Sequence, residues 1–194
     1  MPDVNLISLF PLPSTVFFPS TLLPLHIFEP RYRTMIEHSI ETGQGIGMVL
    51  LQPDWEETYY GRPEINPIGC AGKLEKWLER SDGKYDIVLR GQSRFRVVRE
   101  VTGKPYREAE IEFLPNANDH PIERRTGTPL HRLMSKVWTF RDLLPEDKRE
   151  ALDLSVQDCR TLGNVVDRVA YQLDLALEQK QVFLEELDVA ERLA

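Results

Sequence analysis

The stretch Leu22–Ser39, LLPLHIFEPRYRTMIEHS, changes its periodicity at Glu29-Pro30. Up to Phe28 its apolar run is typical of a buried strand, whereas from Pro30 onward apolar residues recur at the spacing of a helix. Proline fixes φ and has no N–H to donate, so it suits the first turn of a helix, and the carboxylate of Glu29 favours the positive end of the helix dipole. Gly43 is a typical helix end. The stretch therefore predicts a strand that turns directly into a short helix.

Short apolar segments dominate the first 115 residues of the chain. In addition to the strand at the start of the opening stretch, strands are expected at Val4–Phe10, at Ile46–Leu51 and at REAEIEF, residues 107–113. The stretch between Gln52 and Pro67 contains proline, glycine and polar residues and is typical of a long loop. This part of the chain is predicted to be mainly β.

The clearest hairpin joins IGCAGKLEKWLE, residues 68–79, to YDIVLRGQSRFRVV, residues 85–98. The connecting residues include Asp82-Gly83, a dipeptide that suits a two-residue type I′ turn. The sequence therefore predicts two long antiparallel strands in a register set by this turn.

That register makes a specific prediction about Trp77. It pairs Trp77 with Val88 and Leu78 with Ile87, and adjacent residues of a strand point to opposite faces. If Leu78 and Ile87 face the interior, Trp77 and Val88 lie outside. Trp77 then either packs under the carboxy-terminal helices or remains at least partly exposed as a docking surface.

The character of the chain becomes helical after residues 115–129. LHRLMSKVWTFRDLL, residues 130–144, has helical spacing and is followed by Pro145. Two further apolar stripes, one starting at Leu162 and the other at Phe183, predict two packed helices. We therefore expect a β subdomain at residues 1–115 and a helical subdomain at residues 116–194.

The composition narrows the class of protein. The chain has 194 residues, a net charge of −7 and 41% hydrophobic residues, which is enough to form a core. Prolines interrupt every apolar stretch before it reaches the length of a membrane span, and the amino terminus does not resemble a secretory signal, so a cytoplasmic protein is expected. Cys70 and Cys159 have no metal-ligand spacing and are expected to be buried thiols.

The sequence offers no catalytic motif. None of its three Gly-Lys pairs has the preceding glycine or the following Ser or Thr of a phosphate-binding loop. Its four histidines lack HExxH spacing, and no Gly-x-Ser-x-Gly elbow is present. We therefore expect no catalytic residues, no metal site and no cofactor.

Four arginines follow one another along one predicted strand, at Arg90, Arg94, Arg96 and Arg99. They could form a strip that contacts RNA, or they could be structural. Because Glu75 is placed to pair with Arg90 and the chain is acidic overall, structural arginines are favoured and nucleic acid is an unlikely partner.

Several of these motifs occur together, and in this order, in one known family. The stretch LFPLPSTVFFPSTLLPLHIFEPRYRTMIE, then GIGMVL, then GCAGKLEKWLERSDGKYDIVLRGQSRFRVV, resembles the amino-terminal substrate-binding domain of Lon proteases. The similarity is greatest to small stand-alone bacterial proteins that consist of this domain. VVDRVAYQLDLALEQKQVFLEELDVAERL is similar to the helical extension that follows it.

The resemblance implies an α+β fold, namely a PUA-like β pseudo-barrel with one inserted short helix, followed by a carboxy-terminal helical bundle. Two family motifs are present, and we interpret both as mainly architectural. The strand-to-helix motif comprises Pro24, Leu25, Phe28, Glu29, Pro30, Arg31 and Tyr32, and the G-x-x-R-F motif comprises Gly91, Arg94 and Phe95. Glu29 and Arg31 are expected to fix the corner by charge-assisted hydrogen bonds.

The resemblance also implies a function. It points to a non-catalytic module that binds unfolded or exposed polypeptide segments, as an adaptor or regulator in protein quality control with a protease or chaperone partner. The ATPase and serine-lysine protease modules of full-length Lon do not occur in this sequence.

Five residues are candidates for polypeptide binding: Trp77, Val88, Trp55, Tyr59 and Tyr60. The three loop aromatics could instead fold back as a lid over the core. A binder of RNA or of a small ligand is the alternative function, since PUA-like folds elsewhere bind RNA.

Overall fold

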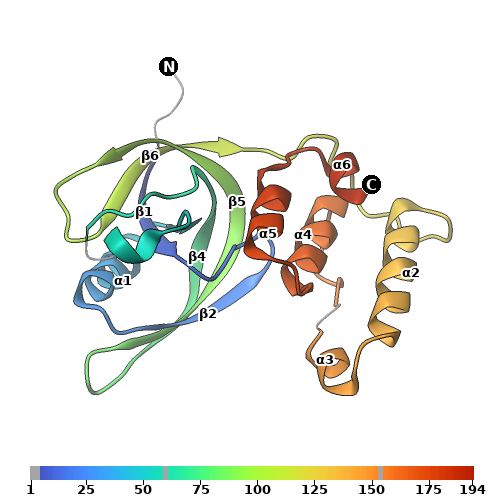
Figure 1. Cartoon of the computed structure of the whole chain (residues 1–194), viewed down its shortest axis with the longest axis horizontal. Coiled ribbons are helices and arrows are strands. Elements are labelled where there is room, and N and C mark those ends of the chain that lie inside the picture. Colours follow the sequence, from blue (N-terminus) through green and yellow to red (C-terminus); the bar gives the residue numbers. More distant parts are fainter. Residues whose placement is uncertain (1–4, 59–60, 153–154) are drawn as a thin grey trace. The chain divides into compact units, whose positions relative to one another are not determined.

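The computed structural model describes residues 5–58, 61–152 and 155–194. The chain divides into two compact units, Met1–Pro115 (unit 1) and Asn116–Ala194 (unit 2). Unit 1 contains the strands and one long helix, whereas the regular structure of unit 2 is helical (Figure 1). In the described part of both units, no helix is long and apolar enough to cross a membrane.

Unit 1 is built on a mixed six-stranded sheet in the order β2-β5-β4-β3-β1-β6. Its elements are β1 (Asn5–Leu12), β2 (Leu22–Ile27), α1 (Pro30–Thr42), β3 (Ile46–Leu50), the 3₁₀ turn η1 (Trp55–Thr58), β4 (Ile68–Glu79), β5 (Tyr85–Val101) and β6 (Arg107–Leu114). β1 is parallel to β3, and the other pairings are antiparallel. Because β6 pairs with both β1 and β5, five of the strands form a closed circuit of pairings.

β5 is the longest strand and pairs with β2, β4 and β6. Gly91 lies near the middle of β5, where the backbone of residues 18–21 passes directly against it. The Gly91 N–H donates to the Thr21 carbonyl and the Ser20 N–H donates to the Gly91 carbonyl, both at 2.9 Å. A Cβ on Gly91 would lie 2.1 Å from the Phe18 carbonyl oxygen, so the glycine of the G-x-x-R-F motif is required by this backbone contact.

The other two residues of that motif, Arg94 and Phe95, are fully buried. Phe95 belongs to a core cluster of buried side chains carried by the strands. Its other members are Ile7, Leu9, Val49, Ala71, Ala109 and Ile111. The motif therefore lies in the interior of unit 1.

The turn between β4 and β5 differs from the two-residue turn that was expected. The Gly83 N–H donates to the Arg80 carbonyl and the Arg80 N–H donates to the Lys84 carbonyl, which leaves three residues, 81–83, in the connection. Gly83 has a φ of +73°, as expected for the last residue of a three-residue hairpin loop. The extra residue moves the register by one position.

The predicted cross-strand pairs are therefore wrong. Trp77 lies opposite Ile87, Leu78 lies opposite Asp86, and Lys76 lies opposite Val88. Ile87 is buried at 2% exposure, but Leu78 is 61% exposed and so does not face the interior with it. Trp77 is 51% exposed, so its side chain is accessible as expected although the predicted register was wrong.

Three of the four arginines of β5 are paired with glutamates of neighbouring strands. Arg90 Nη2 lies 2.7 Å from Glu75 Oε1, Arg96 lies 3.6 Å from Glu112, and Arg99 Nε lies 3.3 Å from Glu110 Oε2. Glu75 occupies an irregularity between Leu74 and Lys76 and reaches Arg90 from there, not from a directly opposite position. With the fourth arginine, Arg94, buried, these residues do not form an open cationic strip.

Unit 2 contains α2 (Pro129–Asp142), α3 (Glu146–Ala151), α4 (Leu162–Gln172), α5 (Leu177–Glu185) and α6 (Val189–Leu193). The predicted apolar stripe of α4 supplies much of its core, with Leu162, Val165, Val166 and Val169 all buried. An ion pair between Arg192 of α6 and Asp167 of α4 is also buried. The amide of Asn116 accepts a second hydrogen bond from Arg192, 2.8 Å long, and thus joins the first residue of unit 2 to α6.

Candidate functional site

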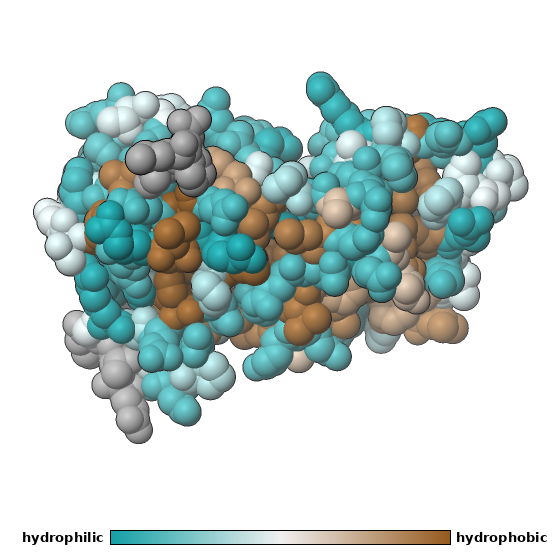
Figure 2. All heavy atoms as spheres, turned by 90° about the horizontal axis from the view of Figure 1, so that it is seen from above, coloured by the Kyte–Doolittle hydropathy of each residue, from teal (hydrophilic) through white to brown (hydrophobic). Residues whose placement is uncertain are grey.

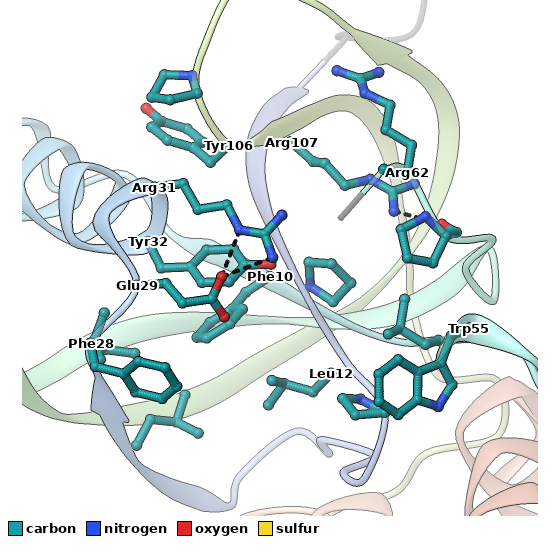
Figure 3. A pocket seen from close by; sticks show the side chains of 18 of the residues that line it. Phe10, Leu12, Phe28, Glu29, Arg31, Tyr32, Trp55, Arg62, Tyr106 and Arg107 are labelled. Atoms are coloured by element: carbon teal, nitrogen blue, oxygen red, sulfur yellow. Dashed lines mark hydrogen bonds and ion pairs between the residues drawn. The ribbon is translucent and has the colours of Figure 1, made fainter. Parts of the chain in front are cut away.

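A cleft of about 740 Å³ opens on unit 1, and we call it the corner cleft. Its walls come from the end of β1, from the β2–α1 corner, from η1 and the residues after it, and from the connection between β5 and β6. It lies entirely within unit 1. Figure 3 labels ten of the side chains that line it, and these approach the cleft from all of these segments.

The β2–α1 corner is built as the opening stretch predicts. β2 ends at Ile27, α1 begins at Pro30, and Glu29 is the N-cap residue with extended backbone angles. The Glu29 side chain makes no cap hydrogen bond; it accepts a 3.0 Å hydrogen bond from Arg31 Nε and lies 2.9 Å from Arg31 Nη2 (Figure 3). This charge-assisted pair holds the corner closed, as expected.

Aromatic side chains of the corner lie on either side of this ion pair. Tyr32 is buried, and its ring lies 4.3 Å from that of Phe10, centroid to centroid, while the Arg31 guanidinium lies 4.6 Å from the Tyr32 centroid. Phe28, in contrast, is 60% exposed and lines the cleft (Figure 3). The prediction of a buried strand up to Phe28 is wrong for much of its length, because only Leu23 and Ile27 of β2 are buried and the strand ends before Phe28.

The opposite wall carries positive charge. Arg107 Nη1 donates to the Pro63 carbonyl at 2.8 Å and Arg107 Nε donates to Glu100 at 2.9 Å, while Arg62 lies 3.7 Å from the same glutamate. Lys104 lines the cleft beside them. Two arginines thus share the carboxylate of Glu100, and Glu56 of η1 is a further acidic residue among those that line the cleft.

Tyr106 lies between these walls and is almost fully buried. Within the described residues its hydroxyl has no hydrogen-bond partner. A buried phenol without a partner is costly, so it is a position at which a bound group could be favoured.

The structure separates the predicted binding residues. Trp55 is half-buried in η1 and lines the corner cleft. Tyr59 and Tyr60 lie outside the described residues. Trp77 and Val88 line another depression, of about 580 Å³, on the β4–β5 hairpin.

Several residues of the corner cleft were not predicted from the sequence. They are Phe10, Arg62, Lys104, Tyr106 and Arg107. They come from positions 10, 62 and 104–107, and no local pattern links these segments; only the sheet brings them together. Phe28 was predicted as a motif residue, but its exposure was not foreseen.

Acid–base side chains of the described residues lie close together on the surface of unit 1, at His26, Arg80 and Asp86. Among the described residues, no group of three His, Cys, Asp or Glu side chains could hold a metal ion. His26 Nδ1 lies 2.7 Å from Asp86, but Arg80 Nε also lies 2.7 Å from that carboxylate. The pKa of Asp86 is lowered by the hydrogen bond from Arg80 and then by that from His26, which makes this a surface ion-pair cluster.

Comparison with known families identifies the chain. The model of the ATP-dependent protease La (LON) substrate-binding domain matches residues 7–194. The chain belongs to this family. The matched residues include both the strand-to-helix motif of the β2–α1 corner and the buried G-x-x-R-F motif of β5.

Lon proteases are among the relatives of the chain, and the chain corresponds to one part of them. It is 28% identical to Lon protease 2 of Myxococcus xanthus over 191 residues, which is 97% of this chain and 22% of the relative. It is 29% identical to the Lon protease of Anaeromyxobacter dehalogenans, covering 95% of this chain and 22% of that protein. The chain thus spans less than a quarter of the length of these relatives.

Two solved structures have the same fold. A Lon N-terminal domain protein from Xanthomonas campestris superimposes with a TM-score of 0.69 at 24% identity, covering 98% of this chain and 95% of that one. The N-terminal domain of the Mycobacterium avium complex Lon protease superimposes with a TM-score of 0.62 at 17% identity, covering 97% of this chain and 94% of that one. At these identities the similarity concerns the fold alone.

Proposed function

We propose that this LON substrate-binding domain is a non-catalytic module that binds unfolded or exposed polypeptide segments, and that the corner cleft is the binding site. The exposed Phe28 is the observation that carries the proposal, because the Glu29–Arg31 pair and Pro30 fix a large apolar side chain at the edge of a cleft. Trp55 presents a second aromatic to the same cleft. Exposed apolar side chains held in this way often mark interaction sites.

The shape and the polar groups of the corner cleft also suit a polypeptide. A cleft of about 740 Å³ can take several side chains, and apolar clefts with a few polar groups are typical binding sites. Lys104 and the arginines of one wall can interact with backbone carbonyls or carboxylates of a bound segment. Phe10 and Tyr32, packed together, add apolar surface to the lining.

In the cell we propose a cytoplasmic adaptor or regulator in protein quality control, with a protease or chaperone as partner. The family description, a substrate-binding domain of an ATP-dependent protease, supports this role.

We also propose that the two units are separate subdomains. Residues 1–115 would form a PUA-like subdomain and residues 116–194 a helical bundle. The closed circuit of strand pairings supports the pseudo-barrel.

Binding of RNA or of a small ligand has less support. An RNA-binding strip needs accessible cations, and on β5 Arg90, Arg96 and Arg99 are engaged with glutamates while Arg94 is buried. The unpartnered hydroxyl of Tyr106 is compatible with a small ligand as well as with a peptide. Polypeptide binding accounts for the exposed aromatics, so it is favoured.

The proposal is tested with a permanently unfolded polypeptide, such as fluorescein-labelled, reduced and carboxymethylated α-lactalbumin, in an anisotropy titration. Phe28→Ala and Trp55→Ala should each weaken binding roughly five- to thirtyfold, as alanine substitutions of aromatic anchors do. Phe113→Ala is the matched control, because Phe113 is 45% exposed on β6 and does not line the cleft. Unchanged binding by a folded Phe28→Ala variant, or an equal loss in the control, would contradict the proposal.

The same titration separates polypeptide from RNA. Affinity for a labelled RNA must fall steeply as salt rises, because phosphate contacts depend on counterion release. Tight, salt-sensitive RNA binding without binding of unfolded polypeptide would favour the alternative function.

A further inference from the structure

A second surface of unit 1 is centred on Trp77, and we call it the Trp77 cleft. It is a hollow of about 350 Å³ between the last turns of α1 and the end of the β4–β5 hairpin. Its apolar part is formed by Ile40 of α1, by the exposed Trp77 and Leu78 of β4, and by the buried ring of Tyr85. Hydrophobic side chains reach the surface of both units (Figure 2), and Trp77 and Leu78 are among the most exposed.

The rim of the Trp77 cleft is acidic. Glu37, Glu41 and Glu79 line it, and among the described residues none of them forms an ion pair. The pKa of Tyr85 is raised by burial, then by the charges of Glu79 and Glu37, with Arg33 acting in the opposite direction. Two of the carboxylates therefore lie close enough to influence the same phenol, and so does the Arg33 guanidinium.

The other cations of the hairpin do not neutralise this rim. Lys84 is paired with Asp82, and Arg80 is paired with Asp86. Lys76 lines the neighbouring depression with Val88 and not the Trp77 cleft. Three carboxylates thus line the apolar hollow; among the described residues no cation lines it, although Arg33 acts on Tyr85 from nearby.

The strand that carries Trp77 also has a free edge. β4 pairs with β5 along its length, but it pairs with β3 only at residues 70–72. On the side away from β5, residues 73–79 have no strand partner in the described part of the chain. A free strand edge offers backbone N–H and C=O groups to an added extended segment.

We propose that the Trp77 cleft docks an extended polypeptide segment in which a large apolar side chain is flanked by lysine or arginine. The apolar side chain contacts Trp77 and Ile40, and the cations lie beside Glu37, Glu41 and Glu79. This site is distinct from the corner cleft, whose lining is rich in arginine, and it would give the domain a preference for basic segments.

The test compares two fluorescein-labelled peptides that differ only in charge, GSGKFKFKGSG and GSGEFEFEGSG, titrated with the full chain by anisotropy. The titrations use a Phe28→Ala background, so that the corner cleft contributes little. At about 50 mM salt the lysine peptide should bind at least about tenfold more tightly than the glutamate peptide, and most of this difference should disappear at about 500 mM, where exposed charges are screened.

Charge variants locate the site. Glu41→Gln with Glu79→Gln should weaken binding of the lysine peptide about five- to tenfold. Glu64→Gln with Glu150→Gln is the matched control, because it makes the same change in net charge at exposed residues outside the cleft and should leave the affinity unchanged. Trp77→Ala should weaken binding similarly, with circular dichroism confirming that the variant is folded.

Three results would overturn the proposal. Equal affinity for the two peptides would exclude the preference for cations, and an equal loss in both charge variants would show a general effect of net charge. A wild-type dimer that becomes monomeric in Trp77→Ala, measured by analytical ultracentrifugation, would identify the occupant as a second copy of this chain. If unfolded α-lactalbumin fails to bind while the lysine peptide binds, the corner-cleft function fails and this inference stands.

Discussion

Replacement of Gly91 by alanine should destabilise unit 1 strongly. An ideal Cβ at this position would lie 2.1 Å from the Phe18 carbonyl oxygen and 2.9 Å from its carbon, and both are backbone atoms that cannot move independently. The crossing chain must therefore shift, and overpacking of this kind costs about 1–3 kcal/mol. The shift also weakens the two 2.9 Å hydrogen bonds that Gly91 makes with Ser20 and Thr21, each worth about 0.5–1.5 kcal/mol. We expect a total loss of about 2–6 kcal/mol in the free energy of unfolding.

The measurement is urea-induced unfolding of the full chain, followed by tryptophan fluorescence and by circular dichroism. The neighbouring, exposed Gln92 provides the control, since Gln92→Ala should change the free energy of unfolding by less than about 0.5 kcal/mol. A Gly91→Ala protein that is within about 1 kcal/mol of the wild type, well below the expected loss, would refute the reasoning. It would mean that residues 18–21 do not cross β5 as closely as the structure has them.

Three further predictions concern other parts of the chain. Glu29→Ala should cost only about 0.5–1 kcal/mol in thermal unfolding, because it removes a partly exposed ion pair and no cap hydrogen bond; a larger loss would show that the carboxylate itself starts the helix. Arg192→Met should cost about 3–5 kcal/mol, because it leaves the buried carboxylate of Asp167 without its partner, and a melting temperature like that of the wild type would contradict this. Arg80 lowers the pKa of Asp86 from an ordinary value near 3.8, so the stability from this pair is present above that value and is lost as pH falls through the lowered pKa. Urea midpoints between about pH 6 and pH 2.5 should fall more in the wild type than in Asp86→Asn, and equal slopes would count against the contribution.

The sequence by itself was sufficient to predict the helices α1 and α4. Pro30 and the change of apolar spacing after Phe28 predicted α1, which begins at Pro30 and ends at Thr42, before Gly43. The apolar stripe starting at Leu162 predicted α4 in the same way. These signals are readable because helix starts, helix ends and apolar periodicity depend on residues within a few positions of each other.

The hairpin marks the limit of such local signals. Asp82-Gly83 is compatible with a two-residue and with a three-residue connection, and the structure has the latter. The choice depends on how β4 and β5 pair along their whole length, including the irregularity between Leu74 and Lys76, and no single dipeptide specifies that. The exposure of Trp77 was predicted, but from the wrong register.

The corner cleft was decided by tertiary structure alone. Its walls come from residues near positions 10, 28, 55, 62 and 106, and no local pattern in the sequence links these segments. β1 meets β3 on one side and β6 on the other, and these pairings across distant parts of the chain set which side chains face the same space. The sequence by itself determined the strand, the helix and the residues of the corner, because those depend on steric and hydrogen-bonding preferences of adjacent residues; only the closed circuit of strand pairings placed Phe28, Trp55 and Arg107 around one cleft.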